Sequence, residues 1–172
     1  FYYICIMVLD IYTDAGGCGI RKIRIGAVVV NQNDPDYKGY KFSRKTTVNL
    51  VKDKLGFKTE QFKSNSTIAE MYSIREVLKE VMTLDVDIKT INIYTDSMIS
   101  FNICNGLQRK IKCELLKRIN ESIISFKSVL KNTEINFMWI KGHAGTWGNE
   151  EADLLCKAHQ EEVNEIQQIL PK

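Results

Sequence analysis

The chain has 172 residues, of which 44% are apolar and 26% are charged. This length suits one ordinary domain and this composition supports a packed core, so collagen, coiled-coil and low-complexity classes are excluded. The net charge of +3 is too weak by itself to indicate a nucleic-acid partner. Residues 1–66, however, carry 11 basic against 6 acidic side chains, so a polyanion is expected to contact this part first.

The five cysteines are scattered and form no C-x-x-C pair: Cys5, Cys18, Cys104, Cys113 and Cys156. This pattern indicates neither a disulfide framework nor a zinc site, and it favours a reducing compartment, cytoplasmic or nuclear. The apolar opening, residues 1–9, ends at Asp10, far short of the ~20 residues that span a membrane. No membrane association is therefore expected. The first residue is Phe1 rather than Met, which leaves open whether the chain is a fragment.

Three strands are predicted in the first third of the chain: a run ending with residues 8–13, then residues 25–30, then roughly residues 40–48. Turn-forming residues 33–36 separate the second from the third. Their short connections favour an antiparallel meander. Residues 49–66 follow as a polar, Lys-rich connection, which we interpret as a basic insertion.

The rest of the chain alternates helices and strands within a single predicted domain, residues 1–172. Apolar spacing predicts a helix over residues 68–82, opened by a capping box of Thr67 and Glu70. A strand at 89–95, helices at 97–105 and 114–131, a strand at 134–141 and a final helix capped by Asn149 follow, with residues 159–172 as its extension. Strands separated by helices must be parallel neighbours, so an α/β fold with a mixed sheet flanked by helices is expected.

The tetrapeptide Ile-Tyr-Thr-Asp occurs twice, at residues 11–14 and 93–96, each time at the end of a predicted strand. If these two strands are parallel neighbours about 4.8 Å apart, Asp14 and Asp96 converge at their carboxyl ends. In open α/β sheets this edge is where ligands bind. Two carboxylates held together repel, and a shared hard divalent cation relieves the repulsion.

Glu70 begins a helix that can pack on the sheet, and Asp153 lies one turn inside the final helix, so either can complete this acidic cluster. Four carboxylates suit two Mg²⁺ ions, which clamp the attacking and leaving oxygens of a phosphodiester. Each residue also has a purely structural interpretation. Asp14 can begin a turn, Asp96 can cap the following helix and Glu70 can be the partner in the capping box. Asp153 can interact favourably with the helix dipole. The joint pattern favours the cluster, because four independent caps have no reason to meet at one sheet edge.

His143 lies in a loop with three glycines between the last strand and the last helix, where it can carry protons or assist product release. It can equally donate a hydrogen bond to a neighbouring carbonyl. His159 is interpreted as a packing or surface residue.

These residues, in this order, resemble the type 1 ribonuclease H family. The most specific segment is residues 139–153, which is similar to the closing signature of that family with its His-to-Asp spacing. Residues 12–14 with the following glycines, Thr67-x-Ala69-Glu70 and residues 95–98 match the other three blocks. The resemblance runs from about residue 9 to residue 158.

The resemblance implies a five-stranded mixed sheet of order 3-2-1-4-5 and cleavage of the RNA strand in RNA/DNA hybrids, leaving 5′-phosphate and 3′-hydroxyl ends. It implies two Mg²⁺, replaceable by Mn²⁺, and no small-molecule cofactor. By the resemblance, Asp14, Glu70, Asp96 and Asp153 are metal ligands, Glu70 also contacts the RNA 2′-hydroxyl, and His143 acts on its loop. Candidate substrate-binding residues are Gly16, Gly17, Lys63, Asn65, Ser66, Thr67, Ser97 and Asn149.

Two departures from the family concern substrate binding. Ser66 and Thr67 stand where the family usually has an amide pair, and the basic handle is reduced to residues 107–112 without a tryptophan. The lysines of residues 49–66 are candidates for a replacement handle that neutralises phosphates.

Three functions therefore compete: a free-standing monomeric ribonuclease H, the ribonuclease H domain of a larger reverse transcriptase-like polyprotein, and a silent nucleic-acid-binding domain of the same fold. The complete acidic set favours the first two.

Overall fold

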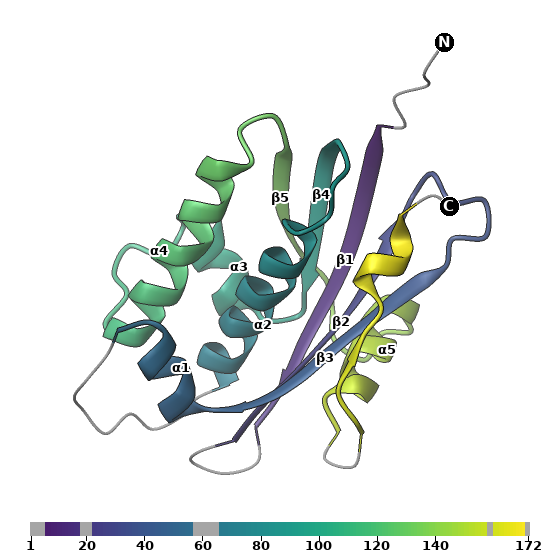
Figure 1. Ribbon diagram of the computed structural model, residues 1–172. Helices are drawn as coiled ribbons and strands as arrows, with labels where there is room; N and C mark the ends of the chain where they lie inside the picture. Colours follow the sequence, from purple (N-terminus) through teal and green to yellow (C-terminus); the bar gives the residue numbers. More distant parts are fainter. Residues whose placement is uncertain (1–5, 18–21, 57–65, 158–159, 171–172) are drawn as a thin grey trace.

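A twisted mixed sheet runs through the centre of the computed structural model, which describes residues 6–17, 22–56, 66–157 and 160–170 (Figure 1). The strands are β1 (Met7–Gly16), β2 (Lys22–Asn31), β3 (Gly39–Thr47), β4 (Ile88–Thr95), β5 (Glu134–Trp139) and β6 (Val163–Asn164). The helices are α1 (Val48–Lys54), α2 (Ser66–Val81), α3 (Met98–Cys104), α4 (Glu114–Val129), α5 (Trp147–Leu155) and the short 3₁₀ helix η1 (Ile166–Ile169).

The strand order is β5-β4-β1-β2-β3-β6. The pairs β1·β2 and β2·β3 are antiparallel, and the pairs β1·β4 and β4·β5 are parallel. The predicted order 3-2-1-4-5 and the antiparallel meander are therefore confirmed, and the sheet gains a sixth strand. Central β1 pairs with parallel β4 on one side and antiparallel β2 on the other, which places its carboxyl end beside that of β4.

Strand alternation separates two different faces of the sheet. Leu9 and Ile11 of β1 are fully buried in the main core, which α2 covers together with α4. Asp10, Tyr12 and Asp14 point to the opposite face, because successive side chains of a strand alternate. Helix α5 covers the β1, β2 and β3 part of that face. The polar residues of β1 therefore lie outside the main apolar core.

A buried ion network fixes α2 against the sheet and against α4. Glu76 is fully buried and accepts hydrogen bonds from Arg44 of β3 and from its neighbour Arg75. Arg75 also donates to the hydroxyl of Ser122 in α4, 2.9 Å away. A buried carboxylate is tolerated only when it is paired in this way. These interactions fix the orientation of α2 about its own axis, and therefore also the position of Glu70 near the start of the helix.

The C-terminal segment differs from the predicted helix extension over residues 159–172. Beyond α5, the described residues instead form β6, which pairs with β3, and η1, whose Ile166 and Ile169 are buried in the main core. The helical part of this segment is confined to the four residues of η1, and both of its isoleucines point toward the core.

Two predicted helix caps are also wrong. Helix α5 begins at Trp147 with Thr146 as its N-cap, so Asn149 lies within its first turn and does not cap it. Helix α2 already includes Ser66, so Thr67 is not an N-cap residue. The predicted basic insertion over residues 49–66 begins with the short helix α1, whose buried Val48 and Val51 attach it to the core.

Three cysteines are free: Cys104, Cys113 and Cys156; Cys5 and Cys18 lie outside the described residues, as does His159. No helix in the described ranges is both long enough and apolar enough to cross a membrane.

Candidate functional site

The two Ile-Tyr-Thr-Asp segments lie side by side at the carboxyl ends of β1 and β4. Tyr12 is in register with Tyr94, and the two rings stack with their centroids 4.8 Å apart. Because Asp14 and Asp96 each follow two residues later, their side chains reach the same edge of the sheet. The predicted convergence of these carboxylates is confirmed.

Glu70 joins the two aspartates from the first turns of α2. One carboxylate oxygen each from Asp14, Glu70 and Asp96 lie within 4.8 Å of one another. Glu70 is only 7% exposed, and its buried Oε2 has no hydrogen-bond partner. A buried oxygen without a partner costs about 1–3 kcal/mol, so this arrangement is unfavourable without a further ligand.

Burial and mutual repulsion raise the pKa of two of these acids. Burial raises the pKa of Asp14 to about 6, although a hydrogen bond from the backbone N–H of Ala15 opposes the shift, and the charge of Asp96 adds to it. Burial raises the pKa of Glu70 well above its ordinary value, and the charges of Asp14 and Asp96 raise it further. Both shifts come first from burial, and the neighbouring carboxylates add to them.

A hard divalent cation fits this cluster. In the described part of the chain, Asp14, Glu70 and Asp96 form no ion pair with Lys, Arg or His. All three offer oxygen atoms, which Mg²⁺ and Mn²⁺ prefer. A cation bound there would satisfy the partnerless oxygen of Glu70 and reverse the repulsion that raises its pKa.

Asp153, the fourth predicted ligand, lies on α5 outside this group of three. Both of its carboxylate oxygens accept hydrogen bonds from Lys157, one helical turn later, at 2.9 Å. Its charge still contributes to the raised pKa of Asp14. Asp153 thus stands near the cluster with its carboxylate already paired. Lys157 was not singled out from the sequence, although its i, i+4 spacing from Asp153 is the signal that could have found it.

The loop after β5 is packed closely against Asp96. A β-carbon on Gly142 would lie 2.7 Å from Asp96 Oδ2, so a side chain there would displace the carboxylate. Trp139 at the end of β5 donates from its indole N–H to the backbone oxygen of Asp96, 3.1 Å away. His143 follows in a left-handed conformation (φ 51°) and is exposed. Its ring is therefore accessible at the border of the acidic cluster.

Asn149 and Ser97 make contacts inside the protein. Asn149 is 3% exposed, and its Nδ2 donates to Asp96 Oδ2 at 3.4 Å, while its Oδ1 is buried without a partner. Ser97, rather than Asp96, is the N-cap of α3, and its hydroxyl accepts from the backbone N–H of Ser100. The Asp96 carboxylate thus does not cap α3, which contradicts the structural alternative for that residue.

The other predicted substrate-binding residues have mixed surroundings. Gly16 ends β1 beside the backbone of Cys156, and Gly17 is exposed. Ser66 is exposed at the start of α2, whereas Thr67 is buried. Lys63 and Asn65 lie outside the described residues. No contact with a substrate follows from these positions, so their roles stay predictions.

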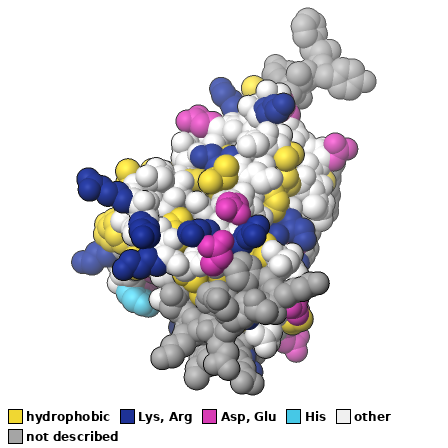
Figure 2. All heavy atoms as spheres, turned by 90° about the vertical axis from the view of Figure 1, so that its left-hand side faces the viewer, with side chains coloured by type: hydrophobic (Ala, Val, Ile, Leu, Met, Phe, Trp, Pro, Cys, Tyr) yellow, Lys and Arg dark blue, Asp and Glu magenta, His cyan; other side chains and the backbone are white. Residues whose placement is uncertain are grey.

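Basic side chains are frequent on the α1 and α4 side of the molecule. Figure 2 shows this face, with many Lys and Arg side chains, a few acidic side chains among them and a histidine at its edge. The reduced handle, residues 107–112, is a loop between α3 and α4, and its Arg109, Lys110 and Lys112 are exposed. The face can attract a polyanion by its charge.

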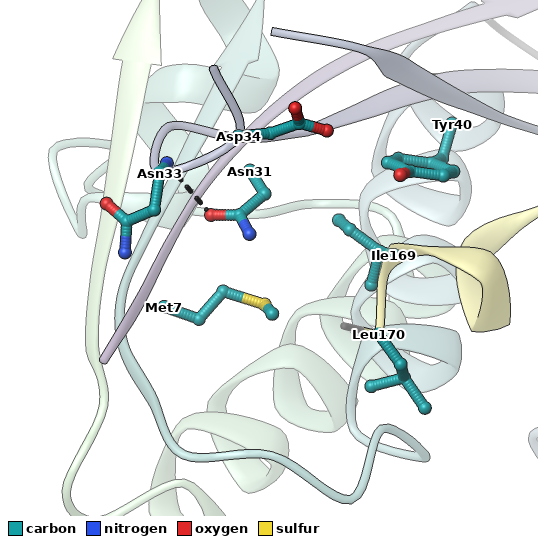
Figure 3. A pocket seen from close by; sticks show the side chains of 7 residues that line it. All are labelled: Met7, Asn31, Asn33, Asp34, Tyr40, Ile169 and Leu170. Atoms are coloured by element: carbon teal, nitrogen blue, oxygen red, sulfur yellow. Dashed lines mark hydrogen bonds between the residues drawn. The ribbon is translucent and has the colours of Figure 1, made fainter. Parts of the chain in front are cut away.

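A cavity of about 230 Å³ lies at the other end of β1, far from the carboxylates. Met7, Tyr40 and the C-terminal Ile169 and Leu170 border it, and Figure 3 shows these apolar side chains opposite Asn31 and Asp34. From Met7 to Asp14 the strand rises about 23 Å at 3.3 Å per residue. This cavity is therefore separate from the acidic site.

The mixed sheet and the acidic edge define an α/β protein with a candidate cation site at the carboxyl ends of its parallel strands. The family model for RNase H matches residues 8–161. The chain belongs to the ribonuclease H family. No curated protein sequence matches the chain.

Solved structures show the same fold at low sequence identity. LC11-RNase H1, isolated from compost by a metagenomic approach, is 22% identical with a TM-score of 0.62, over 86% of this chain and 91% of that one. RNase H1 from the halophilic archaeon Halobacterium salinarum NRC-1 is 15% identical with a TM-score of 0.62, over 86% and 92%. The prototype foamy virus protease-reverse transcriptase is 17% identical with a TM-score of 0.60, over 95% of this chain and 22% of that one.

Proposed function

We propose that this chain is an endoribonuclease that hydrolyses the RNA strand of RNA/DNA hybrids and leaves 5′-phosphate and 3′-hydroxyl ends. The observation that carries the proposal is the cluster of Asp14, Glu70 and Asp96 at the sheet edge, with a buried Glu70 oxygen that lacks a partner. Membership of the ribonuclease H family supports it. LC11-RNase H1, one of the structural neighbours, has been solved in complex with an RNA/DNA hybrid.

Asp14, Glu70, Asp96 and Asp153 would hold two Mg²⁺ ions, or two Mn²⁺ ions in their place. When bound, such ions neutralise charge on the phosphodiester and lower the pKa of water. The protein's own contribution is to hold the carboxylates rigidly: the Tyr12–Tyr94 stack fixes the strand ends, and the ion network of Glu76 fixes α2. Preorganised groups of this kind cost no rearrangement when the reaction occurs.

Two residues would act on the substrate and product. Glu70, near the start of α2, would accept a hydrogen bond from an RNA 2′-hydroxyl, the group that distinguishes RNA from DNA. His143 is exposed on a loop whose Gly142 packs against the Asp96 carboxylate. Trp139, which precedes the loop, donates a hydrogen bond to the backbone oxygen of Asp96. An imidazole there would take a proton or assist departure of the 5′-phosphate.

The test is cleavage of 5′-labelled RNA annealed to DNA by the purified chain in Mg²⁺, Mn²⁺ or EDTA, beside RNA/RNA and DNA/DNA duplexes. We expect metal-dependent cleavage confined to the hybrid. Asp96→Asn, which keeps the shape of the side chain, should abolish it while the circular dichroism spectrum stays unchanged. Binding of hybrid without cleavage by the wild type would favour a silent binding domain instead.

A second candidate is the ribonuclease H domain of a larger reverse transcriptase-like protein. The foamy virus protease-reverse transcriptase, matched over 22% of its length, favours this possibility. The length of the native transcript separates it from a free-standing enzyme, since only the former encodes a polymerase in the same reading frame.

A further inference from the structure

Three basic residues meet at the carboxyl end of β1, across the neighbouring strands. In the β2·β3 ladder Arg24 stands directly opposite Lys45, and Lys22 stands opposite Thr47. Like charges directly opposite on antiparallel strands are destabilising. No ion pair compensates any of the three within the described ranges, and the nearest acid contact is Glu162, which accepts from the backbone N–H of Lys45. The like charges of Arg24 and Lys45 therefore repel each other, and no ion pair within the described ranges offsets this repulsion.

The register relates this basic row to the acidic cluster. Asp14 pairs with Gly26, whereas Gly16 pairs with Arg24, which in turn pairs with Lys45. Arg24 and Lys45 therefore point to the same face of the sheet as Asp14, one strand and two strands away respectively, and both lie two residues further along. Two residues correspond to about 7 Å along a strand. Nucleic acid rises about 3.4 Å per nucleotide along its helix axis, so a hybrid whose axis runs parallel to β1 covers this distance in roughly two nucleotides.

The basic row is open to solvent. Lys22 and Lys45 are exposed and Arg24 is half-buried. Together with Thr46, Thr47 and Leu50 they border an open groove of about 440 Å³. Helix α5 ends at this row, since the backbone oxygen of its C-cap Cys156 lies 3.1 Å from where a β-carbon on Gly16 would be, and Gly16 pairs with Arg24. Lys22 and Lys45 are nevertheless exposed beside the groove, so a phosphate can reach them from solvent.

We propose that Lys22, Arg24 and Lys45 form a phosphate-binding surface for the strand that is cut, at about two nucleotides from the phosphate held at Asp14. This inference rests on the proposed function and adds to it where the substrate runs beyond the acidic cluster. Phosphates would replace the missing counter-charges and turn the repulsion between Arg24 and Lys45 into a shared attraction. A guanidinium can bind a phosphate through two parallel hydrogen bonds, and the lysines add point charges.

The first experiment measures hybrid binding against salt concentration. In the inactive Asp96→Asn chain, the double substitution Arg24→Gln/Lys45→Gln is compared with Lys89→Gln/Lys131→Gln, which removes two exposed charges at the opposite end of the sheet. We expect the first pair to weaken binding about tenfold at 0.1 M salt and to lower the slope of log K against log[salt] by about 1–2. The control pair should change binding less than twofold.

Folding does not confound this comparison, because Arg24→Gln/Lys45→Gln removes a like-charge pair and should leave the urea midpoint equal or higher. If both pairs of substitutions weaken binding equally, the surface is overturned and only general charge matters. If the otherwise native chain neither cuts nor binds hybrid, the proposed function itself fails. If the native chain cuts hybrid but Arg24→Gln/Lys45→Gln leaves binding unchanged, the phosphate-binding surface is overturned and the proposed function stands.

A neutral methylphosphonate placed at single positions of the RNA strand locates the contact. When the neutral linkage lies two nucleotides from the cleavage site, the chain with Arg24 and the Arg24→Gln variant should bind the hybrid with equal affinity. Six nucleotides away, the difference should persist in full. A difference that is independent of where the neutral linkage lies contradicts the assigned position.

Discussion

Two carboxyl groups on the same face of β1, Asp10 and Asp14, lie four residues apart and have opposite surroundings. Asp10 is 4% exposed and accepts hydrogen bonds at 2.9 Å from Gln32 Nε2, Tyr37 Oη and Asn92 Nδ2. Asp14 accepts a hydrogen bond from the backbone N–H of Ala15, and its carboxylate lies among those of Glu70 and Asp96. One site is filled by neutral donors from its own chain, and the other is surrounded by further acids.

This difference separates a structural acid from a candidate functional one better than burial does. Both aspartates are largely withdrawn from water, but the donors around Asp10 leave no oxygen for an outside ligand. Asn136 extends that network by donating to Asn92 Oδ1, which fixes the amide of Asn92 with its N–H group toward Asp10. At Asp14 the compensation has to come from outside the chain, as expected for a site where charge is to be bound.

The largest expected effect is on cleavage. Asp14→Asn should lower the rate of hybrid cleavage in Mg²⁺ at least about 1,000-fold, or ~4 kcal/mol, because a ligand of the cation is lost. Asp10→Asn should change the rate less than about tenfold, since Asp10 contacts no member of the cluster. Single-turnover cleavage of labelled hybrid measures both, and equal losses in the two variants would erase the distinction.

The next effect concerns stability in the absence of metal. The pKa of Asp14 is raised from 3.8 to about 6 in the folded protein, so only well below pH 3.8 do the folded and unfolded states both keep the proton. As pH rises from there toward 6 the unfolded chain loses it first, so the folded state is progressively disfavoured. A shift of about two units corresponds to at most ~3 kcal/mol. Urea unfolding in EDTA should therefore show Asp14→Asn gaining about 1–3 kcal/mol over the wild type at about pH 7.5 and almost nothing at about pH 3.

The control for this measurement is again Asp10→Asn. Its new N–H₂ group would face the donors of Gln32 and Asn92, so it should destabilise the protein by about 1–3 kcal/mol at both pH values. Addition of Mg²⁺ should stabilise the wild type and not Asp14→Asn. A wild-type chain that is as stable as Asp14→Asn at pH 7.5 without metal would contradict the account of the acidic cluster.

The smallest expected effect is at the border of the cluster, where Asp153 is already paired. Lys157→Met should raise the affinity of the site for Mn²⁺ about two- to threefold, because this exposed pair is weak and only modestly occupies the carboxylate. Lys157→Arg keeps the charge and should leave the affinity unchanged. Titration of the substrate-free protein, followed by electron paramagnetic resonance of free Mn²⁺, checks both; identical affinities in Lys157→Met and the wild type would remove Lys157 from consideration.

The sequence predicted those features that depend on local pattern. Apolar alternation and helical spacing located five strands and the helices α2 to α5, and the repeated Ile-Tyr-Thr-Asp segment predicted the meeting of Asp14 and Asp96. Both inferences need only neighbouring residues and the rule that sequential parallel strands align. The helix N-termini were less accurate, because Thr67 and Asn149 have cap-forming side chains but lie inside their helices.

Features assembled from distant segments were not predictable. The donors around Asp10 come from the β2–β3 connection and from β4, and no spacing along the chain relates Gln32 and Tyr37 to Asn92. The segment Val163–Ile169 has apolar residues three apart, which resembles a helix, but its pairing with β3 decides the structure. Lys157 pairs with Asp153 at the i, i+4 spacing of helical ion pairs, but this spacing alone does not indicate that the acid belongs to a functional site.

The C-terminal strand and 3₁₀ helix have a practical consequence for defining the domain. The family match ends at residue 161, before β6 and η1. A fragment cut at that point would uncover the β3 edge and the apolar surface beneath Ile166 and Ile169. An unprotected edge strand beside exposed apolar surface is a template for aggregation. The smallest soluble unit of this protein is therefore expected to extend to about residue 170, beyond the boundary that the family pattern alone would give.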